Sequence, residues 1–98
     1  MDCVKLYFKD SLIGVLTYDD SFKKYIFVKN KFFDNQYIHD VIGLKKEKEV
    51  YSSPTLFSFF LTFLEKYKNE DKKTENPFQQ LIHIAHMDFD RNQFWIGA

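Results

Sequence analysis

The sequence holds few of the residues on which several classes of protein depend. Its 98 residues include one cysteine, two prolines and three glycines. A lone cysteine, Cys3, excludes an internal disulfide bond and fits a reducing compartment. The three glycines are too widely spaced to form a glycine-rich phosphate loop. We therefore expect neither a disulfide-stabilised scaffold nor an enzyme built on a nucleotide-binding loop.

An excess of charge of one sign is also missing. Fourteen basic and fourteen acidic side chains cancel, and Arg91 is the single arginine. No net field draws such a chain to nucleic acid or to an anionic membrane. No apolar run approaches the ~20 residues of a membrane-spanning helix, and the first ten residues lack the apolar stretch of a signal peptide. We expect a cytoplasmic protein with one domain, residues 1–98.

Aromatic residues are abundant in the sequence. They make up 19% of the chain, and twelve of them are phenylalanine. A domain of this length buries only about 60–65% of its unfolded surface, so its core is small. The run of phenylalanines in residues 52–71 therefore raises a question. Either the core takes them all, or some of them serve to bind another molecule.

The first thirty residues alternate in a way that favours β-strands. Residues 3–9 place apolar side chains on one face of a strand and mostly polar ones on the other. The apolar set is Val4, Leu6 and Phe8. Residues 12–18 and 25–29 are predicted as the second and third strands of an antiparallel meander, with Gly14 marking a bulge or a close approach.

The next segment is less regular. Residues 30–40 are predicted to be irregular or a short helix, with Phe32 and Phe33 closing one end of the sheet. Residues 41–46 could form a fourth short strand, and residues 93–96 are predicted as the last one. With the two helices described next, the order is β-β-β-(β)-α-α-β. This predicts the α+β class, a small antiparallel sheet packed with two helices.

A helix is predicted over residues 54–68, with Ser53 as its N-cap and Pro54 at its first position. One arc of about 100° on this helix holds six apolar side chains that would face the core. They are Leu56, Phe57, Phe60, Phe63, Leu64 and Tyr67. Phe59 and Leu61 fall outside the arc, at positions where a surface helix is normally polar. The core thus explains some of these aromatic residues and leaves others over.

A second helix is predicted after Asn76, which is its N-cap, with Pro77 at the first position. Its buried face repeats at the helical spacing i, i+3, i+4 and i+7. That face consists of Phe78, Leu81, Ile82 and Ala85.

Residues with the chemistry for catalysis or metal binding are sparse. His83 and His86 lie three apart on the second helix and precede two aspartates, a set that could suit zinc. However, His83 points away from the apolar face, and no further ligand is evident. Cys3 has no histidine near it in sequence and is interpreted as a half-buried apolar residue. We expect no enzyme activity, no cofactor and no metal.

Two kinds of binding remain. Aromatic residues on a small sheet can stack on nucleic-acid bases, and the predicted strands carry Tyr7, Tyr18, Tyr25 and Phe27. The zero net charge argues against this alternative, because such sheets are normally flanked by clustered basic residues. Surplus aromatic residues agree better with a protein-binding surface, where they are the usual anchors.

The order of the motifs resembles the HipA amino-terminal domain family. "VKLYFKDSLIGVLTYDD" is similar to that family's opening hairpin, and "YIFVKNKFF" to its next strand. "EVYSSPTLFSFFLTFL" resembles the family's most distinctive run, which leads into its first helix. "NPFQQLIHIAHMDFDRNQFWI" is similar to its second helix and last strand.

This resemblance implies a function. In HipA-type Ser/Thr kinase toxins the domain is the first lobe. A free-standing copy resembles HipS of the HipBST toxin–antitoxin systems, which silences the kinase HipT by supplying that lobe in trans. The resemblance implies an antitoxin that binds a HipT-like kinase, with a HipB-like DNA-binding protein as a candidate third member. The alternative is the first lobe of a HipA-type kinase acting as an interaction module. The candidate partner-binding residues are Phe59, Leu61, Phe63, Tyr67 and Trp95.

Overall fold

The computed structural model describes residues 2–33, 36–44, 48–67 and 76–98. The strands in these ranges are β1 (Val4–Phe8), β2 (Ser11–Asp19), β3 (Lys24–Lys29), β4 (Val50–Ser53) and β5 (Phe94–Gly97). The helices are α1 (Gln36–Ile42), α2 (Ser58–Lys66) and α3 (Pro77–Ala85). The strands form one antiparallel sheet in the order β4-β3-β2-β1-β5, which confirms the predicted α+β class.

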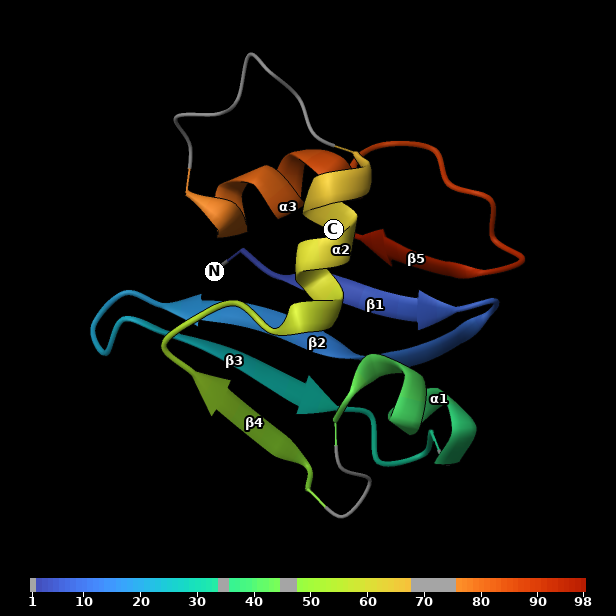
Figure 1. The fold of residues 1–98 in the computed structure, drawn as a ribbon, viewed down its shortest axis with the longest axis horizontal. Coiled ribbons are helices and arrows are strands. Elements are labelled where there is room, and N and C mark those ends of the chain that lie inside the picture. The colour runs from blue at the N-terminus through green and yellow to red at the C-terminus, as the bar shows by residue number, and fades with distance from the viewer. Residues whose placement is uncertain (1, 34–35, 45–47, 68–75) are drawn as a thin grey trace.

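The helices determine which face of the sheet is covered. Figure 1 shows α2 crossing one face of the sheet, with α3 beside it and α1 next to the end of β3. α3 packs against α2 and also against β1 and β5. The last strand therefore lies next to the first, and α3 covers the place where they meet.

The core lies between α2, α3 and the inner face of the sheet. Val4 and Leu6 are fully buried there, as the alternation in residues 3–9 predicted. Phe27 of β3 is also fully buried, and its ring centroid lies 5.8 Å from that of Phe60 in α2. This pair of rings joins the middle of the sheet to the helix above it.

Gly14 combines both of the features expected of it. The register of β1 with β2 shifts between Leu6 and Tyr7, opposite this part of β2, which is the predicted bulge. A Cβ atom at Gly14 would lie 2.5 Å from Cζ of Phe27 and 2.6 Å from the carbonyl oxygen of Val28. Glycine is therefore required here because the neighbouring strand and its ring approach so closely.

Two predictions between β3 and α2 are wrong. The possible strand at 41–46 begins inside α1, which extends to Ile42 and is followed by Gly43 at φ 74°; residues 45–47 lie outside the described residues. The fourth strand is β4 instead. Phe32 does not close the end of the sheet, since 84% of its surface is exposed, whereas Phe33 packs against the core.

The start of the first long helix is also corrected. Ser53 is the last residue of β4, where it pairs with Tyr25 of β3, and its hydroxyl accepts a hydrogen bond from the amide of Thr55 at 3.2 Å. α2 begins only at Ser58, after an N-cap residue, Phe57, that makes no side-chain cap bond. Pairing with β3 and burial of Leu56 thus outweigh the local cap signal of Ser-Pro.

The second long helix agrees well with its prediction. The side chain of Asn76 accepts a hydrogen bond from the amide of Gln79 at 2.9 Å, and Pro77 occupies the first turn. Three of the four residues predicted for its inner face are buried, but Ile84 is buried there and Ile82 is only partly so. The last strand is shifted by one residue from its predicted range, to Phe94–Gly97.

Candidate protein-binding site

Phe59, which the core did not explain, packs against a part of the molecule distant in sequence. Its ring lies 4.9 Å from that of Phe94 at the start of β5, in an edge-to-face arrangement. It also lies 5.7 Å from the ring of Phe63 in the next turn of α2. Edge-to-face pairs at these distances are favourable beyond the apolar area they bury. Phe59 is therefore half-buried at the margin of the core.

A hollow opens beside Phe59, between α2 and the start of β5. It has a volume of about 200 Å³, and we call it the aromatic hollow. Its lining consists of Phe59, Thr62, Phe63, Lys66, Tyr67, Gln93 and Phe94. The Phe63 side chain is 6% exposed and belongs to the hydrophobic core, whereas Thr62, Lys66 and Gln93 are exposed. The hollow is thus an aromatic depression with a polar rim.

The two walls of the hollow have different origins. Phe59, Thr62 and Lys66 are spaced three and four residues apart and share one side of α2. The opposite wall is held by β1: Phe94 pairs with Phe8 at a ring distance of 4.8 Å, and the amide of Lys9 donates to the carbonyl of Gln93 at 3.2 Å. The two walls therefore come from a local helix and a distant strand.

A further ring supports the inner end of the hollow. Phe89, in the segment between α3 and β5, lies 5.0 Å from the ring of Tyr67 and 6.2 Å from that of Phe63. Tyr67 itself stacks on Phe63 at 6.1 Å and ends α2 as its C-cap, its amide donating to the carbonyl of Phe63. These contacts fix the lining side chains, so the hollow is a preformed feature.

The structure separates the five predicted partner-binding residues. Phe59, Phe63 and Tyr67 line the aromatic hollow, although Phe63 is buried and so is not the exposed anchor that was expected. Leu61 is 45% exposed, as predicted, but it lies about 160° around α2 from Phe59 and does not line the hollow. No single compact surface joins Phe59 and Leu61.

Trp95 is held on the sheet face opposite to the core. Its ring stacks on Tyr7 at 4.1 Å with an interplanar angle of 7°, and its indole nitrogen donates to the carbonyl of Lys9 at 2.8 Å. The guanidinium of Arg91 lies 4.6 Å from the ring centroid, within cation–π range. These contacts give Trp95 a structural role in joining β5 to β1; a contact with a partner remains a prediction.

Four lining residues were missed by the sequence argument: Thr62, Lys66, Gln93 and Phe94. Thr62 and Lys66 could have been found, because they lie three and seven residues after Phe59 on the predicted helix. Phe94 and Gln93 could not, since their place depends on β5 pairing with β1. Sequence periodicity gives no signal for that pairing.

The aromatic residues suggested for base stacking are mostly not available for it. Phe27 is fully buried and Tyr25 is 7% exposed, both under the helices. Tyr18 packs against Tyr25 at 4.8 Å, while Tyr7 is covered by Trp95. The stacking prediction is therefore wrong for Phe27 and Tyr25. Burial, and secondarily the neighbouring Tyr18, raises the pKa of Tyr25 above its ordinary value of 10.0.

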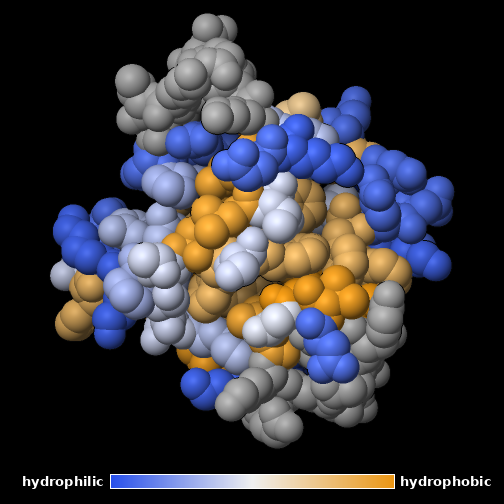
Figure 2. Space-filling view, in the orientation of Figure 1, coloured by the Kyte–Doolittle hydropathy of each residue, from blue (hydrophilic) through white to orange (hydrophobic). Residues whose placement is uncertain are grey.

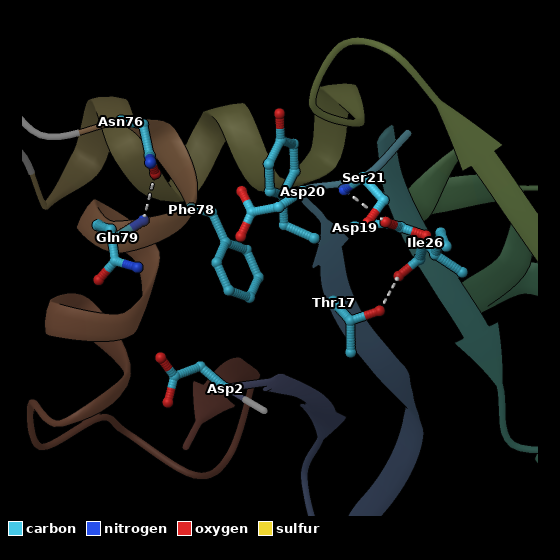
Figure 3. A pocket seen from close by; sticks show the side chains of 10 residues that line it. Asp2, Thr17, Asp19, Asp20, Ser21, Ile26, Asn76, Phe78 and Gln79 are labelled. Atoms are coloured by element: carbon cyan, nitrogen blue, oxygen red, sulfur yellow. Dashed lines mark hydrogen bonds between the residues drawn. The ribbon is translucent and has the colours of Figure 1, made fainter. Parts of the chain in front are cut away.

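A larger cavity, of about 640 Å³, lies between the end of β2 and the start of α3 (Figure 3). Two of its polar side chains already stabilise local turns. Asp19 accepts hydrogen bonds from the amides of Ser21 and Phe22, and Asn76 caps α3. In the ranges that the structure describes, no three histidine, cysteine or acidic side chains are placed to hold a metal. Tyr18 and Phe78 are the aromatic residues of its lining, which otherwise consists mainly of polar side chains, whereas four of the seven residues that line the smaller hollow are aromatic.

The uncovered face of the sheet carries a second apolar surface. Val15, Val28 and Val50 are direct neighbours across β2, β3 and β4. Val28 is 46% and Val50 56% exposed. The three side chains form an aliphatic row without an aromatic ring.

Fold and hollow define a small α+β domain with a preformed aromatic depression. Comparison with protein-family models gives no match for the chain, and comparison with curated protein sequences gives none. None of the helices within the described ranges is both long and apolar enough to cross a membrane.

Proposed function

We propose that this chain is a protein-binding domain and that its aromatic hollow docks on the partner. The observation that carries this proposal is the depression itself, walled by Phe59 and Phe94 with Phe63 beneath. Its volume of about 200 Å³ is below the ~300–1,000 Å³ typical of sites for small molecules and cofactors. A depression of that size suits one anchoring side chain, which is how hot spots of protein interfaces are built.

Figure 2 supports a contact on this side of the molecule. It shows an apolar area extending over the middle of the face on which α2 lies, with hydrophilic side chains along much of its margin. Interfaces commonly combine an apolar centre with a polar rim. The balanced charge of the chain offers no general attraction to polyanions, which favours a protein partner over nucleic acid.

The partner that we propose is a HipT-like Ser/Thr kinase, which the domain would inhibit as a free-standing antitoxin. This part rests on the resemblance of the sequence to the HipA amino-terminal domain family. The domain would dock on the amino-terminal lobe of the kinase, with α2 facing the nucleotide and substrate cleft. Occluding that cleft, or holding it open, would stop phosphorylation. A HipB-like DNA-binding protein is a candidate third component.

The first experiment is a pull-down of the full chain from its native cell, with bound proteins identified by mass spectrometry. We expect a HipA-fold kinase that lacks its own first lobe, and a fall in its phosphorylation activity when the purified chain is added. A kinase that binds without losing activity would refute inhibition. Recovery of only nucleic acid, with a strongly salt-dependent affinity for oligonucleotides, would instead support the nucleic-acid alternative.

Two matched variants test whether the hollow is the contact surface. Thr62→Glu and Leu61→Glu both place a glutamate at an exposed position of α2, one on the rim of the hollow and one on the other flank. Glutamate is a good helix former, so both variants should keep α2. If the hollow is the hot spot, Thr62→Glu loses about 2 kcal/mol of binding energy or more, about thirtyfold in affinity, and Leu61→Glu does not.

If the Leu61 variant lost affinity and the Thr62 variant did not, the interface would lie on the flank of α2 that carries Leu61. Phe59→Ala is the complementary deletion, with folding checked by circular dichroism because the Phe59 ring also contacts Phe63 and Phe94. A folded Phe59→Ala protein that still neutralises the kinase would remove this anchor. Val28→Lys, on the open sheet face, serves as the control for a contact through that face.

A further inference from the structure

We infer that the aromatic hollow recognises a large apolar side chain of the partner that has an aspartate or glutamate next to it in sequence. The inference rests on the proposed protein-binding function, but not on the identity of the partner as a kinase. It adds a chemical specificity to the site, and it follows from the size of the hollow and from the charges around it.

Size restricts the occupant to a single side chain. A volume of about 200 Å³ corresponds to roughly seven water-sized groups at ~30 Å³ each. The four side-chain carbons of leucine or the seven of phenylalanine fit that volume, while alanine or serine would leave most of it empty. The aromatic walls, Phe59 and Phe94, and the buried Phe63 beneath them favour an apolar group.

The charge at the hollow indicates which residue of the partner should stand next to that apolar side chain. Among the residues that line the hollow, all of them described, Lys66 is the one with a charge. Its ammonium lies 5.4 Å from the centroid of the Tyr67 ring and forms no ion pair within the described part of the chain. A partner carboxylate next to the apolar anchor would gain this cation as a counter-charge.

A second cation lies near the β5 wall of the hollow. The amide of Lys9 is bonded to Gln93, and its ammonium is 5.5 Å from the ring of Phe8, which packs on Phe94. The lining holds no carboxylate. A basic residue beside the anchor would therefore meet like charge at Lys66 and again near Lys9. This asymmetry distinguishes an apolar–acidic motif from an apolar–basic one.

Short peptides test the inference on the full chain. The probes are acetylated and amidated tetrapeptides with the sequences GLDG, GLKG and GADG, titrated to millimolar concentrations against ¹⁵N-labelled protein. We expect saturable shifts of the Thr62, Lys66 and Phe94 amides with GLDG. GLKG should bind about fivefold more weakly, the factor that one exposed ion pair provides, and GADG should produce no saturable shift because it cannot fill the hollow.

Charge reversal supplies the matched control. Lys66→Glu should remove the preference for GLDG over GLKG, whereas Lys24→Glu, which reverses an exposed lysine of β3 outside the lining, should leave it intact. Equal binding of GLDG and GLKG to the unmodified chain, or no saturable shift with either, would overturn the inference. Concentration-dependent shifts of the same amides without peptide would overturn it too, by assigning the hollow to a second copy of the chain.

The outcome is separable from that of the proposed function. If a kinase is pulled down and Lys66→Glu binds it as well as the unmodified chain does, the acidic specificity fails and the kinase proposal stands. If no kinase is recovered but GLDG binds selectively, the specificity stands and the kinase proposal fails.

Discussion

Replacing Gly14 by alanine should destabilise the fold, although this change usually stabilises a strand. Alanine in place of a strand glycine normally gains about 0.5–1 kcal/mol through backbone entropy. Here the new Cβ would meet Cζ of Phe27 at 2.5 Å and the Val28 carbonyl oxygen at 2.6 Å. The ring is fully buried and the oxygen belongs to the backbone of the paired strand, so neither can move aside freely.

The expected magnitude follows from these two contacts. Overpacking of a tight core costs about 1–3 kcal/mol, and two unavoidable clashes place Gly14→Ala at the upper end of that range. After subtracting the entropic gain, we expect a net loss of about 2 kcal/mol. At 98 residues the whole fold has about 5–15 kcal/mol of stability. The midpoint of thermal unfolding should therefore fall by roughly 8–16 °C.

Urea unfolding, followed by circular dichroism, measures this loss. Gly97→Ala is the matched control, because its Cβ would lie 3.5 Å from Trp95, an ordinary contact, and its stability should stay the same or rise by up to about 1 kcal/mol. Phe27→Leu should cost less stability in the Gly14→Ala background than in the original chain, since it removes the clash with Cζ but not the one with the Val28 oxygen. A Gly14→Ala protein as stable as the original would refute the close approach of β2 and Phe27.

Two further predictions concern stability. Asn76→Ala should cost about 1 kcal/mol in urea unfolding because the amide of Gln79 loses its cap, while Asn76→Ser should be nearly neutral; equal losses in both would show that the cap bond is not the cause. The raised pKa of Tyr25 means that the folded state holds its proton more tightly than the unfolded state does. The stabilisation that the Tyr25 hydroxyl contributes is thus fully present below pH 10.0, and it is lost as the pH rises through the raised pKa of the folded state. Tyr25→Phe should show a shallower decline in alkaline urea midpoints than the unmodified chain, and identical slopes would contradict this.

Local patterns were sufficient to predict the meander and α3. The alternation around Val4 and Leu6, and the Asn76–Pro77 start signal, are supported by the tertiary structure, so local and global preferences agree there. Local and global preferences disagree at Ser53. Its sequence is a good cap signal for a helix, but Ser53 instead pairs with β3 as part of β4, which gives that edge of β3 its partner strand. The strand predicted at 41–46 was wrong because a short apolar run fits a strand or a helix equally well.

Only part of the candidate site could be predicted from the sequence. The helical arc left out Phe59 and Leu61, and the exposure of Leu61 agrees with that. The partial burial of Phe59 was not predicted, because the helical arc was drawn for packing in one direction only, toward the centre of the sheet. β5 adds a second direction by bringing Phe94 to the flank of α2. The distance between those two residues in sequence is what concealed the contact.

The pairing of β5 with β1 has a consequence for the order of folding. The indole of Trp95 and the carbonyl of Lys9 are 86 residues apart in sequence, so loop closure over nearly the whole chain precedes completion of the hollow. α2 can form from its own turns, but the opposite wall exists only once the two distant strands have met. A ligand held between those walls therefore opposes separation of the strands. Slower amide hydrogen exchange in β1 and β5, far from the ligand itself, would report that the hollow is occupied.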